Sequence, residues 1–266
     1  MGEKIAGTLF IRNGITHDYC FIEAINSLLE ATDQVFVVDA GSVDGTLEIL
    51  EKMPIELITS EAGLWEEMQS MGRERLAWFT NIAIQAAKSA GYKWQFNLQA
   101  DEIIHERSYP YIRRAIERHG SDHGVMCVRH NLWGSSGFML DVAQERKPCS
   151  TEIIRLTQTN RKSVGDAESI DAPCKWLYDE IEIFHMGFVR NKHKMIGKVI
   201  NMQQEVFQMG GYDQKLDQMT DGFDPWVYFS KSDVIQIPGP LPKLIQEWSA
   251  QRDAINQKTP TDGPGE

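Results

Sequence analysis

The feature that most constrains the fold is an alternation of apolar runs with helical patterns through the first hundred residues. Short apolar runs predict strands at residues 5–11, 35–38, 55–60 and 94–98. Apolar residues at helical spacing predict helices over residues 18–31, 46–53 and 72–90. We therefore expect an α/β fold with a three-layer, mainly parallel sheet, in which ligands bind beyond the carboxyl ends of the strands.

The pattern changes after a further predicted helix at residues 109–119. Shorter strands within residues 124–133 and 151–158 predict a mixed portion of the same sheet, and residues 192–209 have a helical pattern. From residue 238 onward, a turn, a last helix and a polar tail predict a helical C-terminal extension.

Charge and cysteine content limit the kinds of partner and compartment. The formal net charge of −11 over 266 residues gives no basic footprint for a phosphate backbone, so nucleic acid is disfavoured as a partner. The four cysteines are widely spaced, and the N-terminal stretch MGEKIAGTLFIRNG has no long apolar core, so we expect a reducing cytoplasm. No run approaches the roughly 20 apolar residues that span a bilayer, so no transmembrane segment is expected.

The stretch WQFNLQADEIIHE, residues 94–106, ends an apolar strand on two adjacent carboxylates, Asp101 and Glu102. Adjacent carboxylates repel each other and resist burial, so a positive group is expected beside them. A divalent metal is one candidate, because Mg²⁺ or Mn²⁺ takes few protein ligands and completes its shell with substrate phosphates. A helix N-cap with an acidic first turn is the alternative.

The stretch VVDAGSVDGT places Asp39 at the end of the second strand, ahead of a Gly/Ser turn and a new helix. A carboxylate at a strand end can accept hydrogen bonds from a base N–H or from ribose hydroxyls. A turn with a good helix cap is the alternative interpretation.

Together these motifs resemble the first half of the family 2 glycosyltransferases of the GT-A fold. That family's second strand typically ends in a vvDdgStDgT pattern, and its fourth strand ends in DaDE or a close variant. The helix before the acidic motif also looks similar, because Arg73 or Arg75 and Asn81 in RERLAWFTNIAIQAA match the family's R…N.g...A pattern. The resemblance covers roughly residues 5–106, in the correct order and spacing.

One position departs from the family pattern, because Gln99 stands where an Asp-x-Asp motif has its first Asp. The resemblance implies that Asp101, the last acid, is a metal ligand and that position 99 faces the nucleotide sugar. The departure therefore affects ribose or sugar contacts more than metal binding. The residues expected to contact the donor in this half are Arg12, Asp39, Arg73, Asn81 and Gln99.

The second half contains EIFHMGFVRNKHKM, in which His185 follows an apolar run. GT-A enzymes often supply a late histidine as a further metal ligand, and His185 resembles that residue; a neutral imidazole suits Mn²⁺ better than Mg²⁺. A buried structural histidine is the alternative. Arg190 and Lys194 belong to a cationic cluster that could neutralise a diphosphate leaving group, or that could be a solvated helix start.

An inverting transfer needs a carboxylate that takes the proton of the acceptor hydroxyl. Family 2 enzymes usually carry this base on a late ED-like motif, of which this chain has no clean copy. Asp166 in SVGDAESI is the first candidate, because a Gly-Asp-Ala turn could hold an acid above the sugar. Glu168 is the second candidate.

The resemblance implies a metal-dependent, hexosyltransferase-like enzyme with Mn²⁺ or Mg²⁺, a nucleotide-diphosphate sugar donor and an unidentified glycan or small-molecule acceptor. It implies a GT-A-like domain over residues 1–237, with a nucleotide-sugar-binding half at 1–106 and an acceptor half at 107–237. Residues 238–266 form the helical extension and frayed tail. A catalytically silent sugar-binding or scaffold protein stays open, as does a nucleotidyltransferase, although FIRNGITHDYC lacks that class's glycine-rich basic loop.

Overall fold

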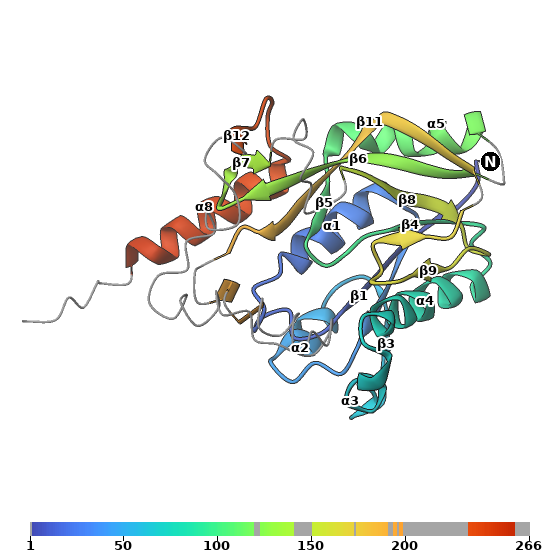
Figure 1. The fold of residues 1–266 in the computed structure, drawn as a ribbon, viewed down its shortest axis with the longest axis horizontal. Helices are drawn as coiled ribbons and strands as arrows, with labels where there is room; N and C mark the ends of the chain where they lie inside the picture. Colours follow the sequence, from blue (N-terminus) through green and yellow to red (C-terminus); the bar gives the residue numbers. More distant parts are fainter. Residues whose placement is uncertain are drawn as a thin grey trace, which may run out of the picture.

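The computed structural model describes residues 2–119, 123–140, 151–172, 174–190, 194–195, 197–198 and 234–258 (Figure 1). The strands within these ranges are β1 (Ile5–Ile11), β2 (Gln34–Asp39), β3 (Glu56–Thr59), β4 (Trp94–Asn97), β5 (Glu102–Ile104), β6 (His123–Trp133), β7 (Ser135–Leu140), β8 (Glu152–Gln158), β9 (Ser163–Val164), β10 (Ser169–Ile170), β11 (Cys174–Phe188) and β12 (Val234–Gln236). The helices are α1 (Phe21–Ala31), α2 (Thr46–Leu50), α3 (Leu64–Glu67), α4 (Glu74–Ser89), α5 (Tyr109–His119) and α8 (Lys243–Lys258), with short 3-10 helices at Met68–Met71 and Glu106–Ser108.

The sheet has a parallel N-terminal part and a mixed remainder. Parallel strands run in the order β3-β2-β1-β4. β8 then pairs antiparallel with β4, and β6 pairs antiparallel with β8. β11 pairs parallel with β6 and antiparallel with β5. The predicted α/β class, with a mainly parallel sheet, a mixed C-terminal portion and a terminal helix, is confirmed.

Helices cover both faces of the parallel part, which gives three layers. α1 and α5 contribute Phe21 and Ile112 to the core on one face, where Leu9 of β1 also lies. α4 contributes Phe79 on the opposite face, where the next residue of β1, Phe10, packs against it. Successive strand residues point to opposite faces, so the continuous apolar runs of β1 and β2 serve both cores.

One local feature differs from the sequence prediction. α1 begins at Phe21 and not at residue 18, because Asp18 has a left-handed, non-helical backbone (φ 56°); the Asp18 carboxylate pairs with Arg252 of α8. Most of the helix predicted over residues 192–209 lies outside the described residues.

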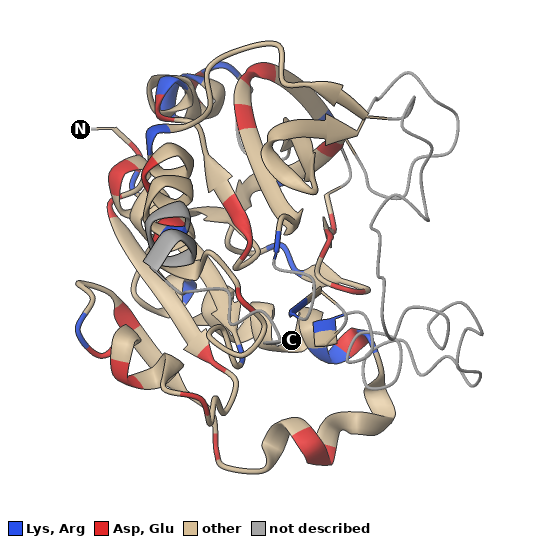
Figure 2. Ribbon diagram, turned by 90° about the vertical axis from the view of Figure 1, so that its left-hand side faces the viewer, with Lys and Arg blue, Asp and Glu red and all other residues tan. Residues whose placement is uncertain are grey.

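Within the described ranges, no helix has the length and apolar character needed to cross a bilayer. Figure 2 shows acidic and basic positions interspersed over the described elements rather than separated onto two faces.

Candidate active site

Asp101 and Glu102 lie where the chain leaves β4 and enters β5. The Glu102 N–H donates to the carbonyl oxygen of Gln99 (3.1 Å), and the N–H of Gln99, a half-buried residue, donates to Oε2 of Glu102 (3.1 Å). β5 pairs antiparallel with β11, which places Glu102 opposite His185. The N-cap interpretation of this stretch is therefore wrong, because the residues after Asp101 form a strand.

Asp101 is buried, with 6% of its surface exposed, and faces two cations and an imidazole. Its Oδ2 accepts hydrogen bonds from Nζ of Lys198 (3.1 Å) and Nη2 of Arg190 (3.2 Å). Its Oδ1 lies 3.7 Å from Nε2 of His185. Burial opposes ionisation, but Lys198, His185 and Arg190 together hold the pKa of Asp101 well below its usual range. Asp101 is therefore a carboxylate in the folded chain.

His185 is held as a neutral imidazole. Its Nδ1 lies 2.9 Å from Oδ1 of Asn131 on β6. Burial lowers the pKa of His185, and the opposing effect of Asp101 does not restore it. The Asn131 contact engages Nδ1, so Nε2 is the ring nitrogen that faces Asp101 and the one that could bind a metal.

Gly187 leaves room for the His185 ring. A Cβ at residue 187 would lie 2.4 Å from both Cε1 and Nε2 of His185, which is closer than such atoms approach. The carbonyl oxygen of Gly187 also accepts hydrogen bonds from Lys198 (3.0 Å) and from Arg190. The sequence His185-Met186-Gly187 thus places the imidazole and helps to hold both cations.

Asp101 and His185 fit a divalent cation as a pair. Oδ1 of Asp101 and Nε2 of His185 lie 3.7 Å apart, and these two residues would hold the ion, because carboxylate oxygens and imidazole nitrogens are both ligands of Mn²⁺. Among the described residues, no group of three or more His, Cys, Asp or Glu side chains could hold a metal. The other ligands would have to be substrate oxygens or water, as is usual for Mg²⁺.

Glu102 is fully buried, and two arginines balance its charge. Arg155 of β8 donates to both carboxylate oxygens (2.8 and 2.7 Å), and Arg129 of β6 donates to Oε1 (3.2 Å). Burial opposes ionisation of Glu102, but Arg155 and Arg129 lower its pKa below the usual value. Asp101 and Glu102 therefore each have cations of their own, and the Glu102 carboxylate is committed to the arginines.

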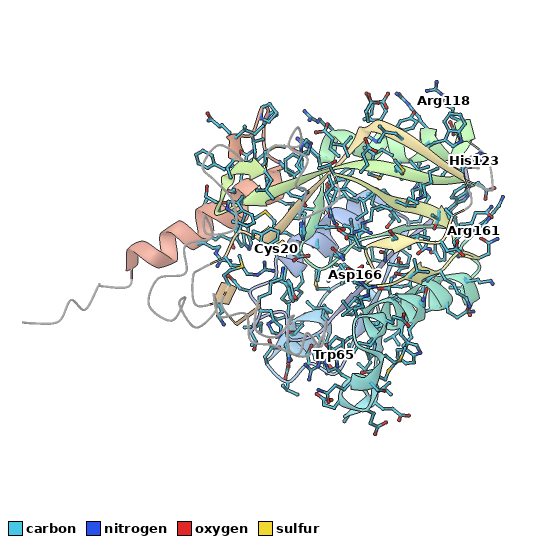
Figure 3. All side chains as sticks on the ribbon, viewed as in Figure 1. Cys20, Trp65, Arg118, His123, Arg161 and Asp166 are labelled. Carbon is cyan, nitrogen blue, oxygen red and sulfur yellow. The ribbon has the colours of Figure 1, made fainter. Side chains whose placement is uncertain are left out.

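The two candidate bases lie in the turn between β9 and β10. Gly165 and Ala167 both have left-handed backbones (φ 63°), a strained conformation for alanine. Glu168 pairs with Arg129, whereas Asp166 is half-buried and its Oδ1 lies 3.4 Å from the N–H of Glu168. Asp166 is labelled in Figure 3. Of the two acids, Asp166 is the one that the buried arginines do not hold.

Two residues predicted to contact the donor, Asn81 in α4 and Arg73 just before α4, lie in different surroundings. The Asn81 amide donates to the Ser163 carbonyl oxygen (2.9 Å) and accepts from the Ser163 N–H (2.8 Å). Asn81 thereby ties α4 to β9, the strand that leads into the Asp166 turn. Arg73 is exposed just before α4 begins. The structure does not bring either side chain to Asp101.

Asp39 ends β2 with one carboxylate oxygen that has no hydrogen-bond partner among the described residues. Its Oδ2 accepts a hydrogen bond from the Ser42 N–H (3.0 Å), whereas its Oδ1 is buried without a hydrogen-bond partner among the described residues. Asn13, after β1, braces the same turn by accepting from the Val43 N–H (2.9 Å). A buried acceptor without a partner costs free energy, so a ligand N–H or O–H would stabilise this end of β2.

Arg12 lies beside an aromatic platform next to β1. Its side chain pairs with Glu66 and lies 5.0 Å from the ring centroid of Trp65. Arg75 lies 4.2 Å from the same ring centroid and is buried. Cation–π contacts of this kind fix the orientation of the α3 segment beside the end of β1.

The two predicted cations of the second half approach the loop that follows β1. Arg190, besides binding Asp101, donates from Nε to the carbonyl oxygen of His17 (2.9 Å). Lys194 is exposed and donates to the carbonyl oxygen of Thr16 (3.1 Å). Only Arg190 of this pair therefore has a hydrogen bond to Asp101 in the described contacts.

Five residues of this site are absent from the sequence prediction, namely Arg129, Asn131, Arg155, Gly187 and Lys198. An arginine inside each apolar run VMCVRHN and EIIRLTQ was the available signal, because a charge in a buried strand needs a buried partner. Lys198 had only its spacing of four residues from Lys194 as a signal.

Comparisons with known proteins give structural neighbours alone, since no family model and no curated protein matches the chain. Residues 1–349 of S. aureus TarS, solved with UDP and with UDP-GlcNAc, are similar at 15% identity and a TM-score of 0.43, over 86% of this chain and 73% of that one. A nucleotidyl transferase from Methanothermobacter thermautotroptrophicus is similar at 15% identity and a TM-score of 0.36, over 60% of this chain and 73% of that one. Similarity at this level does not assign an activity.

Proposed function

We propose that this chain is a glycosyltransferase that moves a sugar from a nucleotide-diphosphate sugar to an acceptor hydroxyl, with Mn²⁺ or Mg²⁺ at Asp101 and His185. One observation carries the proposal. The ionised carboxylate of Asp101, just beyond β4, faces the neutral imidazole of His185, with Oδ1 and Nε2 3.7 Å apart. Asp39, with its unsatisfied Oδ1, ends β2 at the same edge of the sheet. Open α/β sheets bind their ligands at this edge.

The nucleoside of the donor is assigned to the ends of β1 and β2. Oδ1 of Asp39 can accept a hydrogen bond from a base N–H or from a ribose hydroxyl, which would satisfy a buried oxygen. Arg12 follows β1 directly, where Glu66 and Trp65 hold its guanidinium, and it would supply positive charge to the donor. This arrangement supports a nucleotide as the donor's leaving group.

The departing diphosphate would meet fixed positive charge. Arg190 is oriented by the carbonyl oxygens of His17 and Gly187 as well as by Asp101, so its position does not depend on the substrate. Preorganised cations of this kind stabilise the charge that develops on a leaving group. A divalent ion at Asp101 and His185 would supply Lewis-acid stabilisation to the same group.

An inverting transfer would use Asp166 as the base for the acceptor hydroxyl. The left-handed residues on either side of it, Gly165 and Ala167, define the turn that presents its carboxylate. Glu168 is the weaker candidate, because its carboxylate is already paired with the buried Arg129.

The test is calorimetric titration of UDP and GDP with Mn²⁺ and then with EDTA. The wild-type chain is expected to bind one of the two more tightly with Mn²⁺. Asp101→Asn should remove that gain, and Asp39→Asn should weaken binding about tenfold or more under both conditions, because it weakens a hydrogen bond to a charged acceptor. A chain that binds neither nucleotide and hydrolyses no nucleotide sugar contradicts the proposal.

A catalytically silent nucleotide-binding protein is the second candidate. Arg190 and Lys198 already balance Asp101, and Gln99 replaces the first acid of the motif, which favours this alternative. Such a protein would bind nucleotides and turn over no donor. Release of nucleotide from a panel of sugar donors, abolished in Asp166→Asn, would separate the enzyme from the silent protein.

We place the protein in the cytoplasm. Cys20 and Cys127 are buried free thiols, which is usual in a reducing compartment. Burial raises the pKa of both thiols, so neither is a reactive thiolate at neutral pH.

A further inference from the structure

We propose that Lys198 holds the place of the divalent cation at Asp101 in the metal-free protein and leaves it when the ion and the diphosphate bind together. The inference rests on the proposed function and adds a residue that the sequence did not point to. Nζ of Lys198 lies 3.1 Å from Oδ2 of Asp101 and 3.0 Å from the carbonyl oxygen of Gly187. The ammonium group therefore lies on the carboxylate that is the proposed metal ligand.

Lys198, and not Arg190, is the cation suited to exchange. The side chain of Arg190 is fully buried and binds the carbonyl oxygens of His17, Met186 and Gly187 in addition to Asp101. The side chain of Lys198 is 15% exposed and ends a flexible four-carbon stem. Moving the arginine would break a fully buried network. The lysine would give up its contacts with the Tyr19 and Phe188 rings, whose centroids lie 5.5 and 5.9 Å from Nζ, but its partly exposed side chain has a route to solvent.

Charge at the site couples the ion to the diphosphate. Arg190 and Lys198 place two cationic groups on Oδ2 of Asp101, which is a single carboxylate. The excess positive charge repels a bare dication. A diphosphate brings negative charge of its own, supplies oxygens to the ion, and offers the displaced Lys198 a new partner. Mn²⁺ should therefore bind weakly alone and well with a nucleoside diphosphate, and by linkage each should tighten the other.

The test is Mn²⁺ binding itself, followed by the electron paramagnetic resonance signal of unbound Mn²⁺, so that it does not depend on activity. Lys198→Met is expected to bind Mn²⁺ alone about tenfold more tightly than the wild type, in the range of ordinary coupling energies. Lys198→Arg keeps the charge and should bind as weakly as the wild type. Lys88→Met removes an exposed lysine of α4 and is the charge-matched control, with no change expected. Adding UDP or GDP should tighten Mn²⁺ binding more in the wild type than in Lys198→Met.

Equal or weaker Mn²⁺ affinity in Lys198→Met than in the wild type overturns the inference, and so does a wild type that binds Mn²⁺ equally well without a nucleotide. Thermal unfolding checks that the variant is folded, and Lys198→Gln replaces it under the same criterion if it is not. Failure of the proposed function has a different signature, because then no variant would bind UDP or GDP with or without the ion.

Discussion

At residue 187, glycine is required by a side chain two residues away. The ring of His185 occupies the space that a Cβ would fill, at 2.4 Å. Gly187→Ala should therefore displace the imidazole and remove the Mn²⁺-dependent part of nucleotide binding, as His185→Ala would. The overpacking should also lower the free energy of unfolding by about 1–3 kcal/mol. Titration with and without Mn²⁺, together with urea unfolding, measures both effects.

Gly197→Ala is the matched control for that substitution. A Cβ at residue 197 would have no heavy atom of the described residues within 4 Å, so the added methyl group should leave stability and Mn²⁺ response near the wild-type values. If Gly187→Ala instead kept the full Mn²⁺ response, the position of the His185 ring would have no bearing on metal binding.

At the scale of elements, β11 links the site to the rest of the sheet through Glu182. Arg107 donates to both oxygens of this carboxylate (2.8 and 2.5 Å), and Nε2 of His130 lies 2.9 Å from it. Burial opposes ionisation, but His130 and Arg107 lower the pKa of Glu182 from 4.5 to about 2. Because the folded pKa is the lower one, this stabilisation is present above pH 4.5 and is lost as the pH falls toward about 2.

Glu182→Gln should not show the loss of stability that protonation of Glu182 causes at low pH. The variant is expected to be less stable than the wild type at pH 6 and to lose less stability on acidification across the same window. Glu180→Gln, an exposed position on the same strand, should follow the wild-type curve. Urea unfolding at a series of pH values makes the comparison, and identical slopes for Glu182→Gln and the wild type would contradict the assignment.

The strands β1, β2 and β4 were predictable because their apolar runs are buried by helices on both faces, and that signal is local. β5 was not predictable. It has only three residues, and its pairing partner in β11 lies about eighty residues further along the chain. The sequence near residue 102 therefore contains no pattern that predicts this strand. The same pairing decides between a helix cap and a strand for the acidic stretch.

At the scale of the whole molecule, the sequence motifs selected Asp101 and His185 as one metal site, and the fold places their side chains 3.7 Å apart. Their role as metal ligands stays a prediction. What the sequence could not supply was the identity of the countercharges. Arg129 and Arg155 reach Glu102 only because β6 and β8 lie next to each other in the sheet. Such partners follow from tertiary pairing and not from local pattern, and the same holds for Lys198.

The last helix, α8, belongs to the predicted extension at 238–266, and its packing indicates whether that extension is a separate unit. Ile245 of α8 is fully buried in a cluster with Ile103 of β5 and with Phe184 and Met186, which flank His185. The cluster joins α8 to the strands that carry the site. Figure 1 shows α8 packed beside β7 and β12 at one end of the molecule.

Ile245→Ala should therefore destabilise the whole chain and not the helix alone. Removing a buried isoleucine side chain costs about 2–5 kcal/mol, and amide hydrogen exchange in α8 should report the same single transition as far-ultraviolet circular dichroism. The Mn²⁺ response should weaken as well, because the cluster supports the residues on either side of His185. Glu247→Ala, at an exposed position on the same helix, should change little. An α8 transition that precedes the global one, with the Mn²⁺ response intact, would instead make the helix an independent appendage.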